Sequence, residues 1–228
     1  MFMEARYKIG YIDENIKQVK KYTRRLKDFG FEVIGYNFHQ GMSLEELMRQ
    51  VYESDIDLLM IDYKLNEGNI VAFNGDAVES EFYDKRPLFP HIIFTNKVEQ
   101  AEPFVDDWKI LFDKENIFSE DGNDEQSVKR FVTVLTKSIE KYQRHIEKRK
   151  QIISELIYKE NKEGLLLEEK NLLLTTQREL LSLDKMTILE VPETLISIDN
   201  LDKITQARLD AEEFIRSLLE NNNNESKD

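Results

Sequence analysis

Short apolar segments alternate with amphipathic segments of helical period through the first half of the chain, and this alternation most constrains the fold. The apolar, β-prone segments lie at residues 7–12, 31–36, 56–61, 91–95 and 109–112. Apolar residues recur every three or four positions at 15–29 and 43–52, and a further helix is expected at about 75–83, after a long polar loop at 63–74. Strands joined by helices run parallel, because each helix carries the chain back to the starting edge. The pattern predicts an α/β, flavodoxin-like sheet of five mostly parallel strands.

The second half of the chain is predicted to be helical. Apolar residues keep helical spacing from Asp124 to Gly164 with no glycine or proline between, which predicts one helix about 55 Å long. Leucine-rich sequence at about 165–183 predicts a second helix of coiled-coil type. A third is expected at about 199–219, beyond the link that contains Pro192.

These patterns divide the chain into three parts. We expect an α/β domain at residues 1–126, with its last helix continuing from about residue 124. An all-helical region should follow at 127–220. The last residues, 221–228, are polar and of low complexity, so we expect them to be disordered.

Composition removes several classes of function. The chain has no cysteine, which excludes disulfides, thiolate zinc sites and cysteine nucleophiles, and with three histidines the carboxylates must carry any chemistry. The net charge of −13 disfavours non-specific binding to nucleic acid. The apolar runs are too short to span a bilayer, and residues 1–10 lack the apolar core of a signal peptide. We expect a soluble, cytoplasmic protein.

Polar residues follow four of the predicted strands. Asp13 and Glu14 follow the first, Asp62 ends the third, Thr95 ends the fourth, and Lys114 follows the fifth. Ligands of α/β proteins bind at the carboxyl ends of parallel strands, which lie at one edge of the sheet. We therefore expect these five side chains to converge on one pocket.

Simpler structural roles stand beside that expectation. Asp13 and Glu14 can cap the helix that follows them and suit its dipole. Lys114 can form a surface ion pair with Asp113 or Glu115, a kind of pair that contributes about 0–1 kcal/mol.

The order of the strand-end residues resembles a receiver domain, the phospho-acceptor module of two-component response regulators, over about Tyr7 to Leu135. In that family an acidic pair follows the first strand and an aspartate ends the third, while a Thr or Ser ends the fourth and a lysine follows the fifth. The resemblance implies that Asp62 is the phospho-acceptor. It also implies a Mg²⁺ site at Asp13, Glu14 and Asp62.

Physical chemistry supports the roles that this resemblance implies. Three carboxylates in one cleft repel one another and attract a hard cation such as Mg²⁺. The Asp62 carboxylate is the nucleophile, Lys114 offers a positive charge to the phosphoryl group, and Thr95 offers a hydroxyl. Phosphorylation then acts as a conformational signal.

Several positions differ from the receiver pattern. Asn96 follows the threonine, where receivers usually have a small residue, and Glu115 follows the lysine, where they usually have proline. The aromatic switch position falls on Leu111 or, with the register moved by one residue, on Phe112, and the loop after Asp62 is longer than usual. These differences leave an alternative open, namely a pseudo-receiver that is not phosphorylated and serves as a scaffold or interaction module in a multiprotein assembly.

The helical region carries neither a helix-turn-helix with a basic recognition helix nor a glycine-rich nucleotide motif, so DNA binding and a separate catalytic output are not expected. Its leucines can fold back on the long helix or join a second copy of the chain. They are Leu172, Leu173, Leu174, Leu180, Leu181 and Leu183. The expected partners are therefore a histidine kinase or other phosphodonor at the α/β domain, and a protein at the helices.

Overall fold

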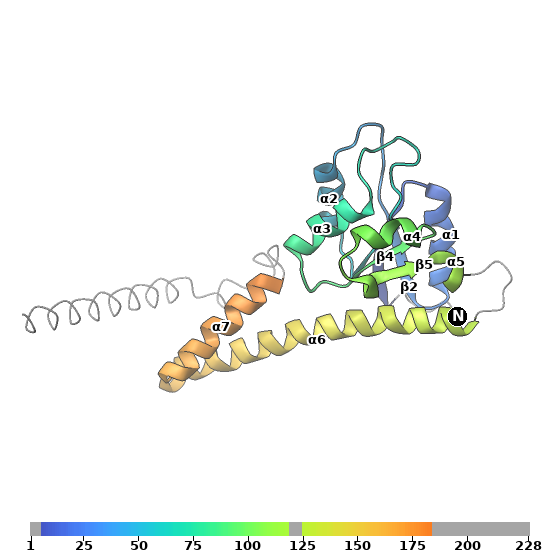
Figure 1. The fold of residues 1–228 in the computed structure, drawn as a ribbon. Helices are drawn as coiled ribbons and strands as arrows, with labels where there is room; N and C mark the ends of the chain where they lie inside the picture. Colours follow the sequence, from blue (N-terminus) through green and yellow to red (C-terminus); the bar gives the residue numbers. More distant parts are fainter. Residues whose placement is uncertain (1–5, 119–124, 184–228) are drawn as a thin grey trace, which may run out of the picture. The chain divides into compact units, whose positions relative to one another are not determined.

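The computed structural model describes residues 6–118 and 125–183 (Figure 1). By their contacts these residues form two units, divided within the longest helix between Lys148 and Arg149. The predicted helix at 199–219, the link that contains Pro192 and the predicted disordered tail lie outside the described residues.

The first unit is built on a five-stranded parallel sheet. Its strands are β1 (Tyr7–Ile12), β2 (Phe31–Gly35), β3 (Leu58–Ile61), β4 (His91–Thr95) and β5 (Leu111–Asp113). They lie in the order β2-β1-β3-β4-β5, and every neighbouring pair is parallel. The predicted flavodoxin-like fold is therefore confirmed. All of β3 is buried, as expected of a parallel strand covered on both faces.

Helices cover both faces of this sheet. Its main helices are α1 (Ile16–Lys27), α2 (Leu44–Glu53) and α3 (Gly75–Lys85). Alternate residues of the strands pack on opposite sides: Leu58 and Met60 belong to the core with α1, whereas Leu59 and Ile61 belong to the core with α2 and α3.

Short helical segments flank the last strand. They are α4 (Val98–Ala101), the 3₁₀ turns Glu102–Phe104 and Trp108–Ile110, and α5 (Lys114–Ile117). These segments are too short for helical periodicity to predict. The fifth strand was predicted at 109–112 but runs from Leu111 to Asp113, because Lys109 lies in a 3₁₀ turn capped by the side chain of Asp107.

The longest helix, α6 (Glu125–Glu163), begins as part of this α/β core. Phe131, Leu135 and Ile139 are buried with α1 against the sheet. Arg6, the residue before β1, pairs with Glu140 at 2.9 Å. The helix predicted from Asp124 to Gly164 thus runs almost to its predicted ends.

The second unit is a helical hairpin made of α6 from Arg149 onward and of α7 (Leu167–Leu183) up to Leu181. The chain turns at Gly164, whose φ of +79° suits glycine at a helix C-terminus. Ion pairs join Arg149 to Glu179, Lys159 to Glu169 and Lys170 to Glu160, so the two helices run antiparallel. No helix among the described residues has both the length and the apolarity needed to cross a membrane.

Candidate functional site

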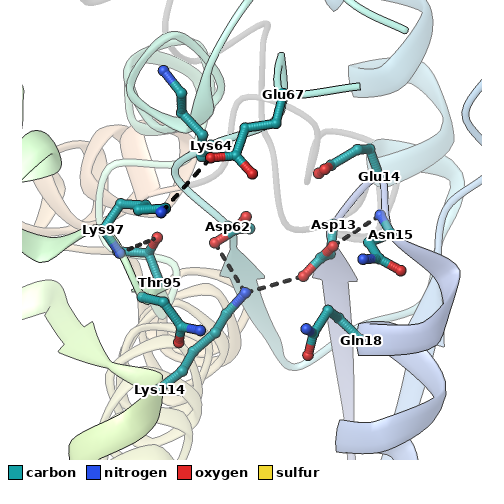
Figure 2. Close-up of a pocket in the computed structure, with 11 residues that line it drawn as sticks. Asp13, Glu14, Asn15, Gln18, Asp62, Lys64, Glu67, Thr95, Lys97 and Lys114 are labelled. Atoms are coloured by element: carbon teal, nitrogen blue, oxygen red, sulfur yellow. Dashed lines mark hydrogen bonds and ion pairs between the residues drawn. The ribbon is translucent and has the colours of Figure 1, made fainter. Parts of the chain in front are cut away.

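A pocket lies at the carboxyl ends of β1, β3, β4 and β5 (Figure 2). It is lined by all five of the strand-end residues singled out from the sequence: Asp13, Glu14, Asp62, Thr95 and Lys114. The strand register explains the convergence. Ile12 pairs with Ile61, and Thr95 pairs with Asp113, so the chain leaves these strands at matching heights.

Lys114 lies between two aspartates at the centre of the pocket. Its Nζ donates to Asp13 Oδ2 at 3.0 Å and to Asp62 Oδ1 at 2.9 Å, as Figure 2 shows. The Lys114 side chain is only 5% exposed, so this is a buried ion pair and not the surface pair considered as an alternative. Asp113 instead caps α5 by accepting the backbone N–H groups of Glu115 and Asn116.

Aromatic rings surround the Lys114 ammonium group. Its Nζ lies 5.5 Å from the ring centroid of Tyr11, 5.9 Å from that of Tyr22 and 5.6 Å from that of Phe94. Ring faces attract cations at such distances. The rings and the two aspartates together hold a charged lysine in a buried position.

Asp13 has donors on both carboxylate oxygens. The Tyr11 hydroxyl donates to Oδ2 at 2.6 Å, and the backbone N–H of Asn15 donates to Oδ1 at 2.9 Å. Asn15, and not the acidic pair, caps α1 with its side chain. Sequence reasoning missed Tyr11, although its position two residues before Asp13 places both side chains on the same side of the extended chain.

The other two carboxylates are in surroundings that disfavour their charge. Burial raises the pKa of Asp62, and Lys114 opposes this rise. Burial also raises the pKa of Glu14 to about 7, and Glu14 Oε2 has no hydrogen-bond partner among the described residues. The single positive charge of Lys114 therefore does not neutralise all three carboxylates.

These observations fit a divalent cation. One carboxylate oxygen from each of Asp13, Glu14 and Asp62 lies within 4.8 Å of the others. Among the described residues this is the one group of three or more acidic, histidine or cysteine side chains placed to share a metal ion. Clustered carboxylate oxygens are the ligands that Mg²⁺ prefers.

Thr95 and the residues after it form another wall of the pocket. Thr95 is fully buried, and its Oγ1 accepts the backbone N–H of Lys97 at 3.1 Å. A hydrogen bond from Thr95 also lowers the pKa of Asp62, although by less than Lys114 does. Asn96 lines the pocket, whereas Glu115 is exposed and lies outside the set of lining residues.

Two further features were not predicted. The mouth of the pocket carries Lys64, Glu67 and Lys97, with Lys97 Nζ 4.0 Å from Glu67 Oε1. Gly75 begins α3 against the backbone of Asp62, where a Cβ would collide with the Asp62 carbonyl. The close approach of α3 to the strand end therefore requires glycine at this position.

No protein-family model and no curated protein matches this sequence. Solved structures do match. The response regulator TrrA from Thermotoga maritima, solved with Mg²⁺-BeF, is 16% identical with a TM-score of 0.40, over 58% of this chain and 99% of its own. The HemR receiver domain from Leptospira biflexa is 14% identical with a TM-score of 0.40, over 59% and 94%.

A longer protein, NtrX from Brucella abortus, is 15% identical with a TM-score of 0.45, and the match covers 67% of this chain but 34% of NtrX. None of these three similarities exceeds 16% identity. The receiver-like fold of this chain is accordingly defined by the order and direction of its own strands, with an acidic pocket at their carboxyl ends.

Proposed function

We propose that this chain is a response-regulator-like signalling protein in which Asp62 accepts a phosphoryl group in a Mg²⁺-dependent reaction. One observation carries the proposal: Asp62 lies at the carboxyl end of β3, held at 2.9 Å by a buried lysine that also binds Asp13. A buried lysine in contact with the strand-end carboxylate suits a nucleophile that must stay ionised and then carry a phosphoryl group, because the ammonium group can bind the carboxylate before transfer and a phosphoryl oxygen after it.

The reaction uses groups already in place. A carboxylate oxygen of Asp62 attacks the phosphorus of the donor, the bond from phosphorus to the leaving group breaks, and an aspartyl phosphate forms. Lys114 is placed to bind a phosphoryl oxygen, because its Nζ is already 2.9 Å from the attacking carboxylate. The hydroxyl of the buried Thr95 can donate to another oxygen.

A Mg²⁺ ion held by Asp13, Glu14 and Asp62 would supply positive charge to the transferring phosphoryl group. The chain's own contribution is to gather the ligands. Asp13 is oriented by Tyr11, Asn15 and Lys114, whereas the unpaired Glu14 Oε2 remains available.

The output is proposed to be a protein contact. In the helical hairpin Leu173, Leu174 and Leu180 are buried, whereas Leu166, Leu167 and Leu172 are exposed and open to a partner. The helix α6 is continuous from the α/β core to the hairpin. A conformational change at the sheet can therefore reach the helical region along this helix. We propose a histidine kinase or other phosphodonor as the partner at the pocket, and another protein or a second copy at the helices.

Acetyl phosphate or beryllofluoride with Mg²⁺ tests the proposal directly. We expect intact-protein mass spectrometry to show one added phosphoryl group with acetyl phosphate, and the melting temperature to rise with beryllofluoride. Both effects should disappear in Asp62→Asn. Asp57→Asn is the matched control, because it changes the same residue type just before β3, where Asp57 accepts the Lys8 N–H at 2.8 Å.

A wild-type protein that gains neither the mass nor the stability would overturn the proposal. The alternative, a pseudo-receiver scaffold, then becomes the better account. It draws support from the same lysine, because an ammonium group that binds both Asp13 and Asp62 also suits a purely structural set of buried charges. A scaffold predicts no response to Mg²⁺ but self-association or partner binding through the helical region.

A further inference from the structure

Asp13 has nearly all of its acceptor capacity filled by the protein. A carboxylate has about four lone-pair sites, two on each oxygen. The Tyr11 hydroxyl and Lys114 Nζ both donate to Oδ2, at 2.6 Å and 3.0 Å. The Asn15 N–H donates to Oδ1 at 2.9 Å. Oδ2 is thus filled, and Oδ1 keeps one site for another ligand.

Tyr11 is well placed to maintain this arrangement. Its side chain is fully buried in the core with Tyr22 and Phe94, and the ring packs edge-on against both. A phenolic hydroxyl is a hydrogen-bond donor at neutral pH. The packed ring therefore holds this donor against Asp13 Oδ2.

We infer that Tyr11 determines which cation the pocket takes, by restricting Asp13 to one metal-facing oxygen. This inference rests on the metal site of the proposed function. An aspartate that binds a metal through one oxygen suits Mg²⁺, which requires near-octahedral geometry at short distances. Ca²⁺ is larger and more often takes both oxygens of one carboxylate. With Oδ2 occupied by the tyrosine and the lysine, Asp13 cannot offer both.

Tyr11→Phe tests the inference, because it removes the hydroxyl and keeps the ring that packs the core. We expect the Kd for Mg²⁺ to rise relative to the Kd for Ca²⁺, so that the ratio of the two constants changes; loss of an outer-shell partner typically changes metal affinity by about 10- to 100-fold. MgCl₂ and CaCl₂ titrated separately by calorimetry give both constants without any phosphodonor.

Tyr36→Phe is the matched control. Tyr36 is also a buried tyrosine, and its hydroxyl shares a hydrogen bond with Ser54 Oγ at 2.9 Å in the other core of the sheet. It should lose a similar amount of stability while leaving the Mg²⁺ to Ca²⁺ ratio unchanged. If the ratio of the Kd values for Mg²⁺ and Ca²⁺ is the same in the wild type and in Tyr11→Phe, the inference is overturned but the proposed metal site is not. Failure of the wild type to bind Mg²⁺ would overturn the metal site and the inference together.

An NMR measurement on the wild-type protein tests the inference without depending on whether a variant folds. The Tyr11 hydroxyl proton, in a short buried bond, should give a slowly exchanging NMR signal far downfield. We expect this signal to persist when MgCl₂ saturates the site, because the ion uses Oδ1. Its disappearance on saturation would show that the metal displaces the tyrosine from Oδ2 and would overturn the inference.

Discussion

The pocket at the sheet edge and the helical hairpin use ionic groups in opposite ways. In the pocket, Lys114 and Asp13 are 5% and 2% exposed, and their charges are enclosed by aromatic rings. In the hairpin, Lys159 and Glu169 are 36% and 26% exposed, and the buried residues described there, among them Leu173, Leu174 and Leu180, carry no charge. A buried ion pair is weak evidence for stability, because the cost of removing its charges from water offsets much of their attraction. This contrast matches the proposed division of roles, with phosphoryl transfer in the pocket and partner contact at the hairpin.

The largest expected effect is at Lys114. Lys114→Met leaves Asp13 and Asp62 buried without their shared cation, and breaking a buried pair in this way typically costs about 3–5 kcal/mol. Urea denaturation at neutral pH measures the loss. A change below about 1 kcal/mol would mean that the pocket behaves like the hairpin surface, and the comparison would fail.

The buried leucines of the hairpin come next. Leu180 is 2% exposed, whereas Leu172 on the same helix is 49% exposed. Leu180→Ala should cost about 2–5 kcal/mol and speed hydrogen exchange of the α7 amides, because it opens a cavity within the hairpin.

Leu172→Gln is the matched change on the exposed side. It should leave hairpin exchange unaltered, and light scattering then decides whether it weakens self-association. If the two substitutions change hydrogen exchange equally, α7 does not have a buried face at Leu180 and an exposed face at Leu172.

Glu14 should contribute to the pH dependence of the free energy of unfolding. Its pKa in the folded protein is about 7, above the ordinary 4.5, so the folded state binds this proton more tightly than the unfolded state. In metal-free protein its contribution to stability is full below about pH 4.5 and is lost as the pH rises toward 7. Glu14→Gln should flatten this part of the profile. The exposed Glu53→Gln serves as control, and an unchanged profile in Glu14→Gln would count against the buried position of this acid.

The smallest effect is expected at the surface of the hairpin. Lys159→Met removes a pair with Glu169 at 2.6 Å that is open to solvent, and such pairs contribute about 0–1 kcal/mol. Its effect on the urea midpoint should be far below that of Lys114→Met. A comparable loss would show that exposed ion pairs, and not leucines, hold the hairpin together.

Much of the fold could be predicted from the sequence because its signals are local. The strands at 7–12 and 91–95 and the start of α3 at Gly75 were predicted at the positions where they occur. Periodicity of two or of three to four residues is set by the backbone itself, so it survives without knowledge of the tertiary structure. Segments of four residues such as α4 and α5 carry no such period, and they were missed.

The sequence by itself also determined which strand-end residues would meet. Parallel strands bring Asp13, Asp62, Thr95 and Lys114 to one edge whatever the details of packing. It did not determine how their atoms are connected. Lys114 binds partners 101 and 52 residues away, and the Tyr11 hydroxyl and the close approach of α3 at Gly75 matter only once the helices have docked. Hydrogen bonds act over about 3 Å, so only the tertiary structure decides which oxygen of Asp13 a lysine, a tyrosine and a metal ion can share.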